Sequence, residues 1–513
     1  MVATSHPLAA QAGLDMLKEG GNAVDAAVAA AAALTVLEPA SNGVGGDAFA
    51  LIWHQGKLHG LNSSGSAPQR LSLEALREAG LERMPRLGMT PVTVPGVPAA
   101  WAALKKRFGM LPLTATLRPA IDYALRGAPV SPVTADLWRR AFLEFKTQKD
   151  ASFRHWFDCF APEGRAPKAG EIWRSEELAQ SLNDIAESDA EAFYGGKLAE
   201  ALHSFSEQCG AYLRGEDLAA FAPEWVEPLK AAYRGVDVWE LPPNGQGLAV
   251  LIALRILDGF EAPALDTPPA WHLRIEALKL AFADAFFHIA DPRRMRVNPM
   301  AFLDERYIES RRKRIGVRAA VPPPGKPLDG GTVYLAAADA ECNMVSYIQS
   351  NFWGFGSGMV VPGTGIALHN RGLGFSLDPA HPNCLMPGMR PYHTIIPGFL
   401  SKNGAPLAAF GVMGAYFQPQ GHVMAVSNML DYGLNPQASL DAPRFRWEEG
   451  LHVDVEHGFP APAAEVLRRM GHDIRCRTAD DRGFGRGQII WRNEDGVLVC
   501  GSEPRCDGQA AAW

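Results

Sequence analysis

The sequence is poor in the patterns that mark membrane, secreted and zinc-binding proteins. No apolar run reaches the about 18 residues needed to cross a bilayer, and the N-terminus has neither the basic stretch nor the apolar core of a signal peptide. The seven cysteines are odd in number and form no C-x-x-C pair, which favours reduced thiols over a disulfide framework or a zinc site. For a chain that has lost no leader, these absences predict a cytoplasmic protein with no membrane partner.

Clustered positive charge and the common catalytic motifs are missing as well. The formal net charge is -7, and the basic run from Arg311 to Arg314 is typical of a solvated helix end, so no nucleic-acid partner is predicted. Gly43-x-Gly45 is followed by Ala48, where a dinucleotide-binding loop needs glycine, and there is no P-loop, G-x-S-x-G or H-E-x-x-H. The histidines show no metal-ligand spacing that stands out, so we predict no metal and no cofactor.

The chain has enough apolar residues for a large core, since 47% of its 513 residues are hydrophobic. Asn22 can cap an Ala-rich helix that runs to about Leu37 and is expected to be buried. We expect further helices mainly before position 316 and strands mainly after position 332, which fits an α/β (α+β) fold with two sheets between layers of helices. The expected helices are 8–18, 176–187, 189–208, 246–257, 270–289 and 420–432; the expected strands are 47–54, 57–62, 332–339, 343–351, 365–370, 393–400 and 406–412, with a β-rich stretch at 226–241.

A segment rich in proline and glycine, residues 319–331, separates the helix-rich part of the chain from the strand-rich part. Proline and glycine in this density cannot continue a helix or pair in a central strand, so the segment is predicted to be an exposed connector. The strand that follows begins at Thr332. Taken alone, Gly331-Thr332 is an ordinary strand start.

Seven segments resemble, in the same order, the gamma-glutamyltranspeptidase family. Together they extend over nearly the whole chain and form a specific signal. They are Glu19-Gly-Gly-Asn-Ala-Val-Asp-Ala-Ala27, Gly43-Val-Gly-Gly46, Thr93-Val-Pro-Gly-Val-Pro98, Leu241-Pro-Pro-Asn-Gly-Gln-Gly247, Phe355-Gly-Ser-Gly358, Asp431-Tyr-Gly-Leu-Asn435 and Asp441-Ala-Pro-Arg-Phe445.

The resemblance implies that the precursor cuts itself between Gly331 and Thr332. A threonine hydroxyl is a weak nucleophile without a base beside it, and cleavage supplies one, because a new α-amino group has a pKa of about 8. Thr332 would then carry both nucleophile and base. The family fold is the four-layer αββα sandwich of the N-terminal nucleophile hydrolases, which a heavy part (residues 1–331) and a light part (residues 332–513) would share.

The oxyanion site implied by the resemblance falls on the backbone N–H groups of Gly414 and Ala415. A tetrahedral intermediate needs such donors, and alanine in the second place still offers its N–H. Without the family context, a plain turn between a strand and a helix explains Gly414 equally well.

The residues that recognise the acyl group depart from the family pattern. Ser64 stands where the family has the arginine that binds the α-carboxylate, and a serine cannot form a bidentate ion pair. Gly374 matches the acidic residue that holds the α-ammonium, and His393-Thr394 replace a pair of serines. Arg371 either supplies a relocated carboxylate contact or forms a surface or structural ion pair. Asn351 completes the predicted substrate-binding set of Ser64, Asn351, Arg371, His393 and Thr394.

The sequence therefore favours an autoprocessed amidohydrolase or acyltransferase. A γ-glutamyl amide or a similar small carboxylated amide is the first expected substrate, and water or an amine is the acceptor. The second hypothesis is a hydrolase of a non-glutamyl amide, as in the divergent branch with cephalosporin acylases and oxamate amidohydrolase. The third is an inactive member that acts as a binding protein, because Val333 and Tyr334 replace the threonine and histidine that usually follow the nucleophile. A homo-oligomer is compatible with the sequence.

Overall fold

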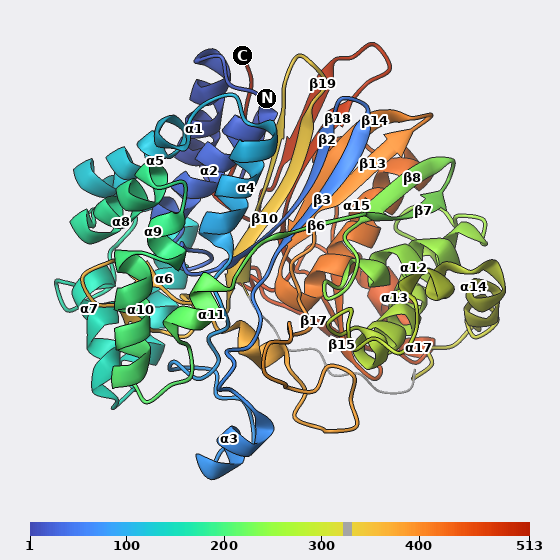
Figure 1. Cartoon of the computed structure of the whole chain (residues 1–513). Coiled ribbons are helices and arrows are strands. Elements are labelled where there is room, and N and C mark those ends of the chain that lie inside the picture. Colours follow the sequence, from blue (N-terminus) through green and yellow to red (C-terminus); the bar gives the residue numbers. More distant parts are fainter. Residues whose placement is uncertain (322–330) are drawn as a thin grey trace.

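The computed structural model describes residues 1–321 and 331–513, and for Gly331 and Thr332 it describes the backbone alone. The expected connector lies for the most part outside the described residues. Two antiparallel sheets form the centre of the molecule (Figure 1). The first has the order β20 (Gln509–Ala511), β1 (Val2–Thr4), β9 (Gly331–Ala338), β10 (Met344–Phe352), β2 (Asp47–His54), β3 (Lys57–Ser63) and β6 (Glu224–Val226). The second has the order β19 (Leu498–Ser502), β18 (Arg486–Arg492), β14 (Ala405–Met413), β13 (Gly398–Lys402), β8 (Val236–Glu240) and β7 (Leu229–Tyr233).

The two sheets pack face to face through apolar side chains. Strand β9 contacts β14 and β18 of the second sheet, and β10 also contacts β14. The rings of Trp53 and Phe399 stack between the sheets with centroids 5.9 Å apart. The Tyr334 ring lies against Gly411, where a Cβ atom would collide with it. Residues on both sides of position 331 contribute strands to each sheet, so the two parts share one core.

Helices cover the outer face of each sheet (Figure 1). The first sheet is covered by α1 (Pro7–Lys18), α2 (Ala23–Leu37) and α4 (Val97–Phe108), and α5 (Leu113–Arg126) packs on α2. Every residue of α2 is buried, and alanine makes this helix narrow enough to lie close to the sheet. The second sheet is covered by α12 (Gly247–Asp258), α15 (Gln418–Tyr432) and α16 (Pro436–Asp441), and α13 (Pro268–His288) packs on α12.

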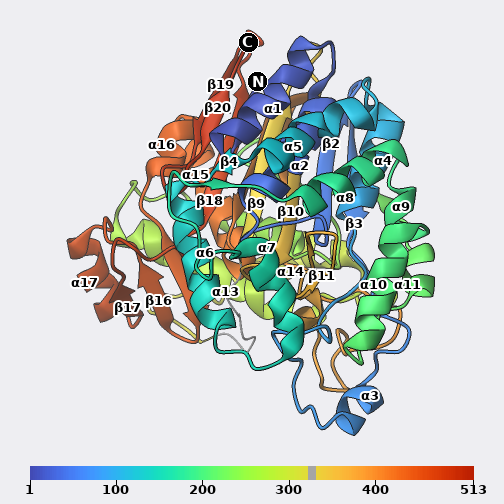
Figure 2. The same cartoon turned by 90° about the vertical axis from the view of Figure 1, so that its left-hand side faces the viewer.

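The remaining elements flank this core (Figure 2). Beyond the helical layer of the first sheet lie α6 (Pro132–Phe145), α7 (Arg154–Phe160), α8 (Glu176–Glu187), α9 (Glu191–Tyr194), α10 (Lys197–Gln208) and α11 (Gly215–Ala219). A three-stranded sheet of β15 (Phe445–Glu449), β16 (His452–Val455) and β17 (Asp473–Cys476) packs with α17 (Ala461–Arg469) near α13. Helices α3 (Leu73–Glu78) and α14 (Glu305–Arg312) lie at the periphery. Among the described residues, no helix combines the length and the apolar character needed to span a bilayer.

Most of the expected elements are confirmed, and three need correction. Asn22 caps α2 as predicted, through its side-chain oxygen and the amides of Val24 and Asp25. The helix expected at 189–208 is broken at Gly195-Gly196 into α9 and α10. Of the strand expected at 365–370, only β12 (Ile366–Ala367) forms.

The third correction concerns the strand expected at 393–400. It begins only at Gly398, because the backbone of His393 bonds residues 244 and 246 instead of a sheet neighbour. The His393 amide donates to the Asn244 carbonyl at 2.9 Å, and the Gln246 amide donates to the His393 carbonyl at 3.0 Å. This segment belongs to the candidate site rather than to the sheet.

Candidate active site

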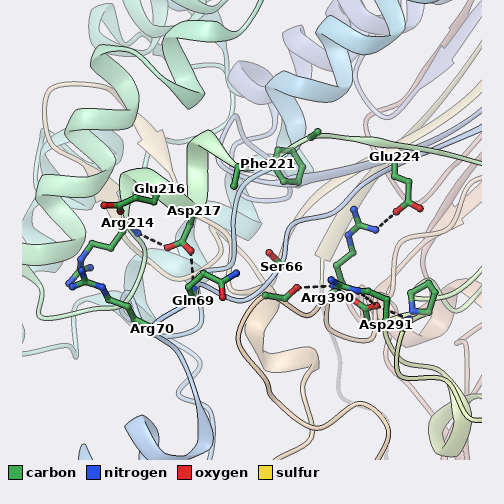
Figure 3. Close-up of a pocket in the computed structure, with 15 residues that line it drawn as sticks. Ser66, Gln69, Arg70, Arg214, Glu216, Asp217, Phe221, Glu224, Asp291 and Arg390 are labelled. Carbon is green, nitrogen blue, oxygen red and sulfur yellow. Dashed lines mark hydrogen bonds and ion pairs between the residues drawn. The ribbon is translucent and has the colours of Figure 1, made fainter.

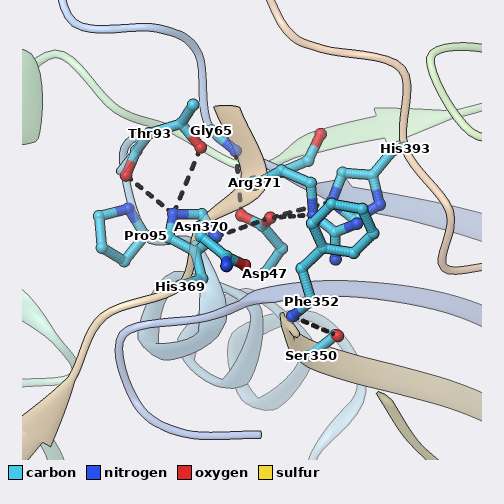
Figure 4. A network of polar contacts seen from close by, with 12 residues as sticks. Asp47, Gly65, Thr93, Pro95, Ser350, Phe352, His369, Asn370, Arg371 and His393 are labelled. Atoms are coloured by element: carbon cyan, nitrogen blue, oxygen red, sulfur yellow. Dashed lines mark hydrogen bonds and ion pairs between the residues drawn. The ribbon is translucent and has the colours of Figure 1, made fainter. Parts of the chain in front are cut away.

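A buried ion network forms around Asp47, the first residue of β2 (Figure 4). Its Oδ2 atom lies 3.0 Å from Nδ1 of His369, 2.9 Å from Nε2 of His393 and 3.2 Å from Nε of Arg371. All four side chains have 0% exposure. A carboxylate buried this deeply is tolerated only when such donors surround it.

The glycine loop before β2 explains how these segments meet. A Cβ atom at Gly45 would collide with the backbone of Ala367, and one at Gly46 would lie 2.5 Å from the Ser350 carbonyl oxygen. Only glycine therefore lets the loop approach both segments this closely. The Gly45 carbonyl accepts the amide of His369 at 3.0 Å, which brings His369 directly beside Asp47.

The network holds charges in a defined arrangement. Burial raises the pKa of the Asp47 carboxyl, but its interactions with His369 and His393 outweigh burial and hold the pKa well below its ordinary value. Burial, with a contribution from Arg371, lowers the pKa of His393 to about 3, so this ring is neutral at neutral pH. Its Nδ1 accepts the Ile395 amide at 3.4 Å, which leaves Nε2–H to donate to Asp47. Burial lowers the pKa of Arg371 to about 10, so the guanidinium stays charged.

Arg371 keeps one donor group unused. Its Nε donates to Asp47, and its Nη1 donates to Oγ1 of Thr394 at 2.8 Å. The guanidinium carbon lies 4.2 Å from the centre of the Phe352 ring. In the described part of the chain, the buried Nη2 has no hydrogen-bond partner. Since an unpaired buried donor is costly, this group is suited to bind an anion.

The predicted cleavage position adjoins Arg371 through the sheet. In the β9–β10 ladder, Gly331 is the partner of Phe352, whose ring lies beneath the Arg371 guanidinium. Phe352 has a φ of 74°, which is rare for a residue other than glycine, and the ladder register shifts just before it. The backbone at Thr332 is therefore next to the network, while its side chain lies outside the description.

Asn351 is a second buried group with unused hydrogen-bonding capacity. Among the described residues, neither Nδ2 nor Oδ1 of its amide has a partner, and the side chain has 0% exposure. Its backbone carbonyl accepts the amide of Asn370, the neighbour of Arg371, at 3.4 Å. The unpaired groups of Asn351 and Arg371 thus come from adjacent segments.

Ser64 lies at the edge of the same network but its hydroxyl is already bonded. The Ser64 hydroxyl donates to Oδ1 of Asn62 at 2.7 Å and lies 3.3 Å from Nδ2 of Asn244. The next amide, that of Gly65, donates to Oδ1 of Asp47 at 3.4 Å. Ser64 therefore shapes the wall of the site and does not replace the missing arginine.

The predicted oxyanion donors form a tight turn at the end of β14. Gly414 has a φ of 135° and Ala415 a φ of 49°. For alanine this left-handed conformation costs about 1–2 kcal/mol. In the described chain, no turn, loop or side-chain acceptor receives either N–H group. Tyr416, the next residue, stacks on Tyr392 with ring centroids 5.8 Å apart, and Tyr392 directly precedes His393, so the turn lies beside the network.

Gln246 ties the turn to the network. Its Nε2 donates to the carbonyl oxygens of Thr394, at 2.6 Å, and of Ala415, at 2.8 Å. Its Oε1 accepts the Tyr392 hydroxyl at 3.1 Å. One neutral amide therefore fixes the distance between the two predicted parts of the site.

An open cavity of about 570 Å³ lies on the outer side of the Ser64–Ser66 segment (Figure 3). Arg390 lines it and connects it to the site, because its Nε donates to the Ser64 carbonyl at 3.0 Å. Asp291 and Arg293 on the same wall pair with each other at 2.6 Å. The cavity is large enough to hold a drug-sized molecule.

Sequence reasoning missed three residues on which this geometry depends, namely Asp47, His369 and Gln246. Two of them lie inside or beside a recognised segment: Asp47 follows Gly43–Gly46, and Gln246 lies in Leu241–Gly247. His369 lies in the stretch 365–370 that was expected to form a strand. Nothing in the sequence showed that both segments converge on residues 369–371 and 393–394. The position that corresponds to the family's acidic residue, Gly374, has no room for a side chain, because a Cβ atom would collide with the Tyr392 carbonyl.

Comparisons with known proteins agree over the full length of the chain. The gamma-glutamyltranspeptidase family model matches residues 9–513. The glutathione hydrolase-like YwrD proenzyme of Bacillus subtilis is 37% identical over 99% of this chain and 98% of that protein, and the oxamate amidohydrolase proenzyme of Klebsiella pneumoniae is 34% identical over 100% and 98%. A crystal structure of cephalosporin acylase from Bacillus halodurans covers 100% of this chain and 95% of that one, with 57% identity and a TM-score of 0.97. The chain therefore belongs to the gamma-glutamyltranspeptidase family.

Proposed function

We propose that the protein is an autoprocessed N-terminal-nucleophile amidohydrolase whose substrates carry a carboxylate, but no ammonium, on the acyl group. The single observation that carries the substrate class is the buried Arg371 guanidinium with Nη2 unpaired beside the predicted cleavage position. The helical layers over two packed sheets fit the four-layer αββα sandwich of this enzyme type. Residues 1–331 and 332–513 would be the heavy and light parts.

Thr332 would carry the chemistry after the Gly331–Thr332 bond breaks. The α-amino group of Thr332 takes the proton from its own hydroxyl while Oγ attacks the substrate carbonyl. The developing oxyanion accepts the N–H groups of Gly414 and Ala415. The amine leaves with a proton from the α-ammonium, and water then hydrolyses the acyl ester on Thr332. The relatives named as proenzymes support the self-cleavage step.

The acyl carboxylate would bind Nη2 of Arg371, with Nδ2 of Asn351 as the second donor. A guanidinium held by Asp47 and Thr394 presents that group in one orientation, which favours a charge-assisted bond. Among the described residues of the network, an α-ammonium would find no anion that is not already paired. Asp47 already accepts bonds from three side chains, and Gly374 cannot be replaced by an acidic residue without moving Tyr392.

The names of the relatives are consistent with this choice. One similar structure is called a cephalosporin acylase, one relative an oxamate amidohydrolase, and one glutathione hydrolase-like. Oxamate is itself an amide with a carboxylate and no ammonium. The γ-glutamyl amides are the second candidate, because one relative has the name glutathione hydrolase-like.

Three p-nitroanilides that differ in one group test the proposal. We expect hydrolysis of glutaryl p-nitroanilide with a kcat/KM about 100-fold above that of pentanoyl p-nitroanilide, which has a methyl group in place of the carboxylate. γ-Glutamyl p-nitroanilide adds only the ammonium to the glutaryl compound and should be at least about 10-fold poorer than it. A γ-glutamyl anilide that outperforms the glutaryl anilide would overturn the proposed substrate class. If the pentanoyl anilide were hydrolysed as fast as the glutaryl anilide, Arg371 would not bind the acyl carboxylate.

A further inference from the structure

Two histidines and a glutamate form a buried cluster apart from the candidate active site. His272 and Glu276 lie one turn apart on α13, and His472 follows α17. Nδ1 of His272 lies 2.8 Å from Nε2 of His472, which lies 3.9 Å from Oε1 of Glu276. The side chains are nearly inaccessible to solvent, with exposures of 5%, 3% and 3% for His272, Glu276 and His472.

Neighbouring backbone groups orient two members of this cluster. Nε2 of His272 lies 2.8 Å from the Gly316 carbonyl oxygen and donates its hydrogen there, so the Nδ1 lone pair accepts the Nε2–H of His472. A metal ion at Nε2 of His472 requires that hydrogen to move to Nδ1 of His472, which has no partner among the described residues. Oε2 of Glu276 accepts the amide of Ala320 at 3.2 Å, which leaves Oε1 facing the histidines. Outer hydrogen bonds of this kind fix the tautomer and the direction of metal ligands in proteins.

We propose that His272 Nδ1, His472 Nε2 and Glu276 Oε1 form a binding site for a divalent transition-metal ion such as Zn²⁺. Two imidazoles and one carboxylate are a ligand set that Zn²⁺ takes in proteins. Bonds of about 2.0–2.1 Å in a tetrahedral site place ligand atoms about 3.3 Å apart. The 2.8 Å and 3.9 Å separations lie on either side of this value, and all three ligand atoms lie within 4.8 Å of one another. Small side-chain movements are sufficient to close the site.

Lys279 competes with the metal ion for Glu276. Its ammonium lies 2.6 Å from Oε1 of Glu276, and the side chain is 1% exposed. A divalent ion at Oε1 must displace this bond and tolerate a nearby positive charge, which weakens binding. Removing the ammonium should therefore strengthen metal binding, whereas a cluster with a purely structural role predicts no gain.

The site joins parts of the chain that are distant in sequence. His272 and Glu276 precede position 331, and His472 follows it. Gly316 and Ala320, which hold the ligands, are among the last described residues before position 322. A bound ion would link α13 and the region of Gly316 and Ala320 to the segment that follows α17. The site itself is independent of the proposed substrate and of self-cleavage.

Equilibrium dialysis of the full-length protein against Zn²⁺, followed by metal analysis, tests the proposal. We expect about one Zn²⁺ per chain, and at least about 10-fold weaker binding in Glu276→Gln and in His472→Asn. Lys279→Met should bind at least about 10-fold more tightly than the unchanged protein. Co²⁺ in place of Zn²⁺ should show the visible absorption of a four-coordinate ion in Lys279→Met.

The matched control is His203→Asn, which alters a half-buried histidine 3.4 Å from Glu207 at the same helical spacing. It should leave Zn²⁺ binding unchanged. Circular dichroism establishes which variants fold, and the Lys279→Met result decides the question even if His472→Asn does not fold. Binding well below one equivalent in both the unchanged protein and Lys279→Met would overturn the proposal, as would equal Zn²⁺ affinity in Glu276→Gln and the unchanged protein.

Discussion

The Asp47 network and the Gly414–Ala415 turn adjoin each other, but different forces hold them. Charged side chains with no solvent exposure fix the network, and each depends on the others. Backbone conformation and one neutral amide, that of Gln246, fix the turn. In the proposed mechanism, backbone donors tolerate a change of side chain, as at Ala415, whereas charge-based recognition depends on the identity of each side chain, as at Ser64 and Gly374. Catalysis and acyl recognition can therefore diverge separately within one fold.

The largest expected effect comes from breaking the network at its centre. Asp47→Asn removes the carboxylate and leaves the buried Arg371 guanidinium without its counter-ion. We expect the free energy of unfolding to fall by about 3–5 kcal/mol, measured by urea denaturation at pH 7. The control Asp237→Asn breaks a solvent-exposed pair with Lys230, 3.1 Å apart, and should cost less than about 1 kcal/mol. Equal losses in the two variants would mean that burial does not distinguish these carboxylates.

The next effect separates recognition from catalysis. Arg371→Lys keeps the charge but cannot bond Asp47, Thr394 and a ligand in one plane. We expect kcat/KM for glutaryl p-nitroanilide to fall by about 100-fold, mainly through KM, while pentanoyl p-nitroanilide changes by less than about 2-fold. Arg293→Lys, in the neighbouring cavity, is the control and should leave both substrates unaffected. An equal loss on both substrates would contradict a carboxylate-binding role.

A smaller effect should come from loosening the turn. Gln246→Met preserves the shape of the side chain but removes the bonds to the Thr394 and Ala415 carbonyls. Misplaced oxyanion donors should lower kcat by about 10- to 100-fold with little change in KM. Gln180→Met, on the exposed face of α8, should leave kcat unchanged. If instead KM rose and kcat were retained, Gln246 would serve recognition rather than the turn.

The smallest effect should come from relieving the strain at the turn. Ala415→Gly keeps the N–H donor and removes the Cβ atom that is unfavourable at a φ of 49°. We expect kcat within about 2-fold of the unchanged protein and a gain in stability of at most about 1 kcal/mol. A large loss of activity would show that the alanine methyl group, not the backbone, is needed there.

The sequence predicted the layers of this fold better than its site. A clear cap predicted α2 and regular periodicity predicted α8, because both signals are local. The segment 393–397 resembled a strand, yet its backbone bonds Asn244 and Gln246, which are about 150 positions earlier in the chain. For Arg371 the sequence allows either an ion pair or a binding role. The side chain is fully buried, pairs with Asp47 and has one donor without a partner among the described residues, a result that only the three-dimensional convergence of four segments could give.

The proposed mechanism depends on a chain break that frees the amino group of Thr332, and N-terminal sequencing of the purified protein tests this most directly. We predict two fragments that stay associated, the smaller beginning at Thr332, and active material only after cleavage. Thr332→Ala should remain one chain of 55.4 kDa and show no hydrolysis of glutaryl p-nitroanilide. An unbroken chain that is active, or activity with alanine at position 332, would contradict the account.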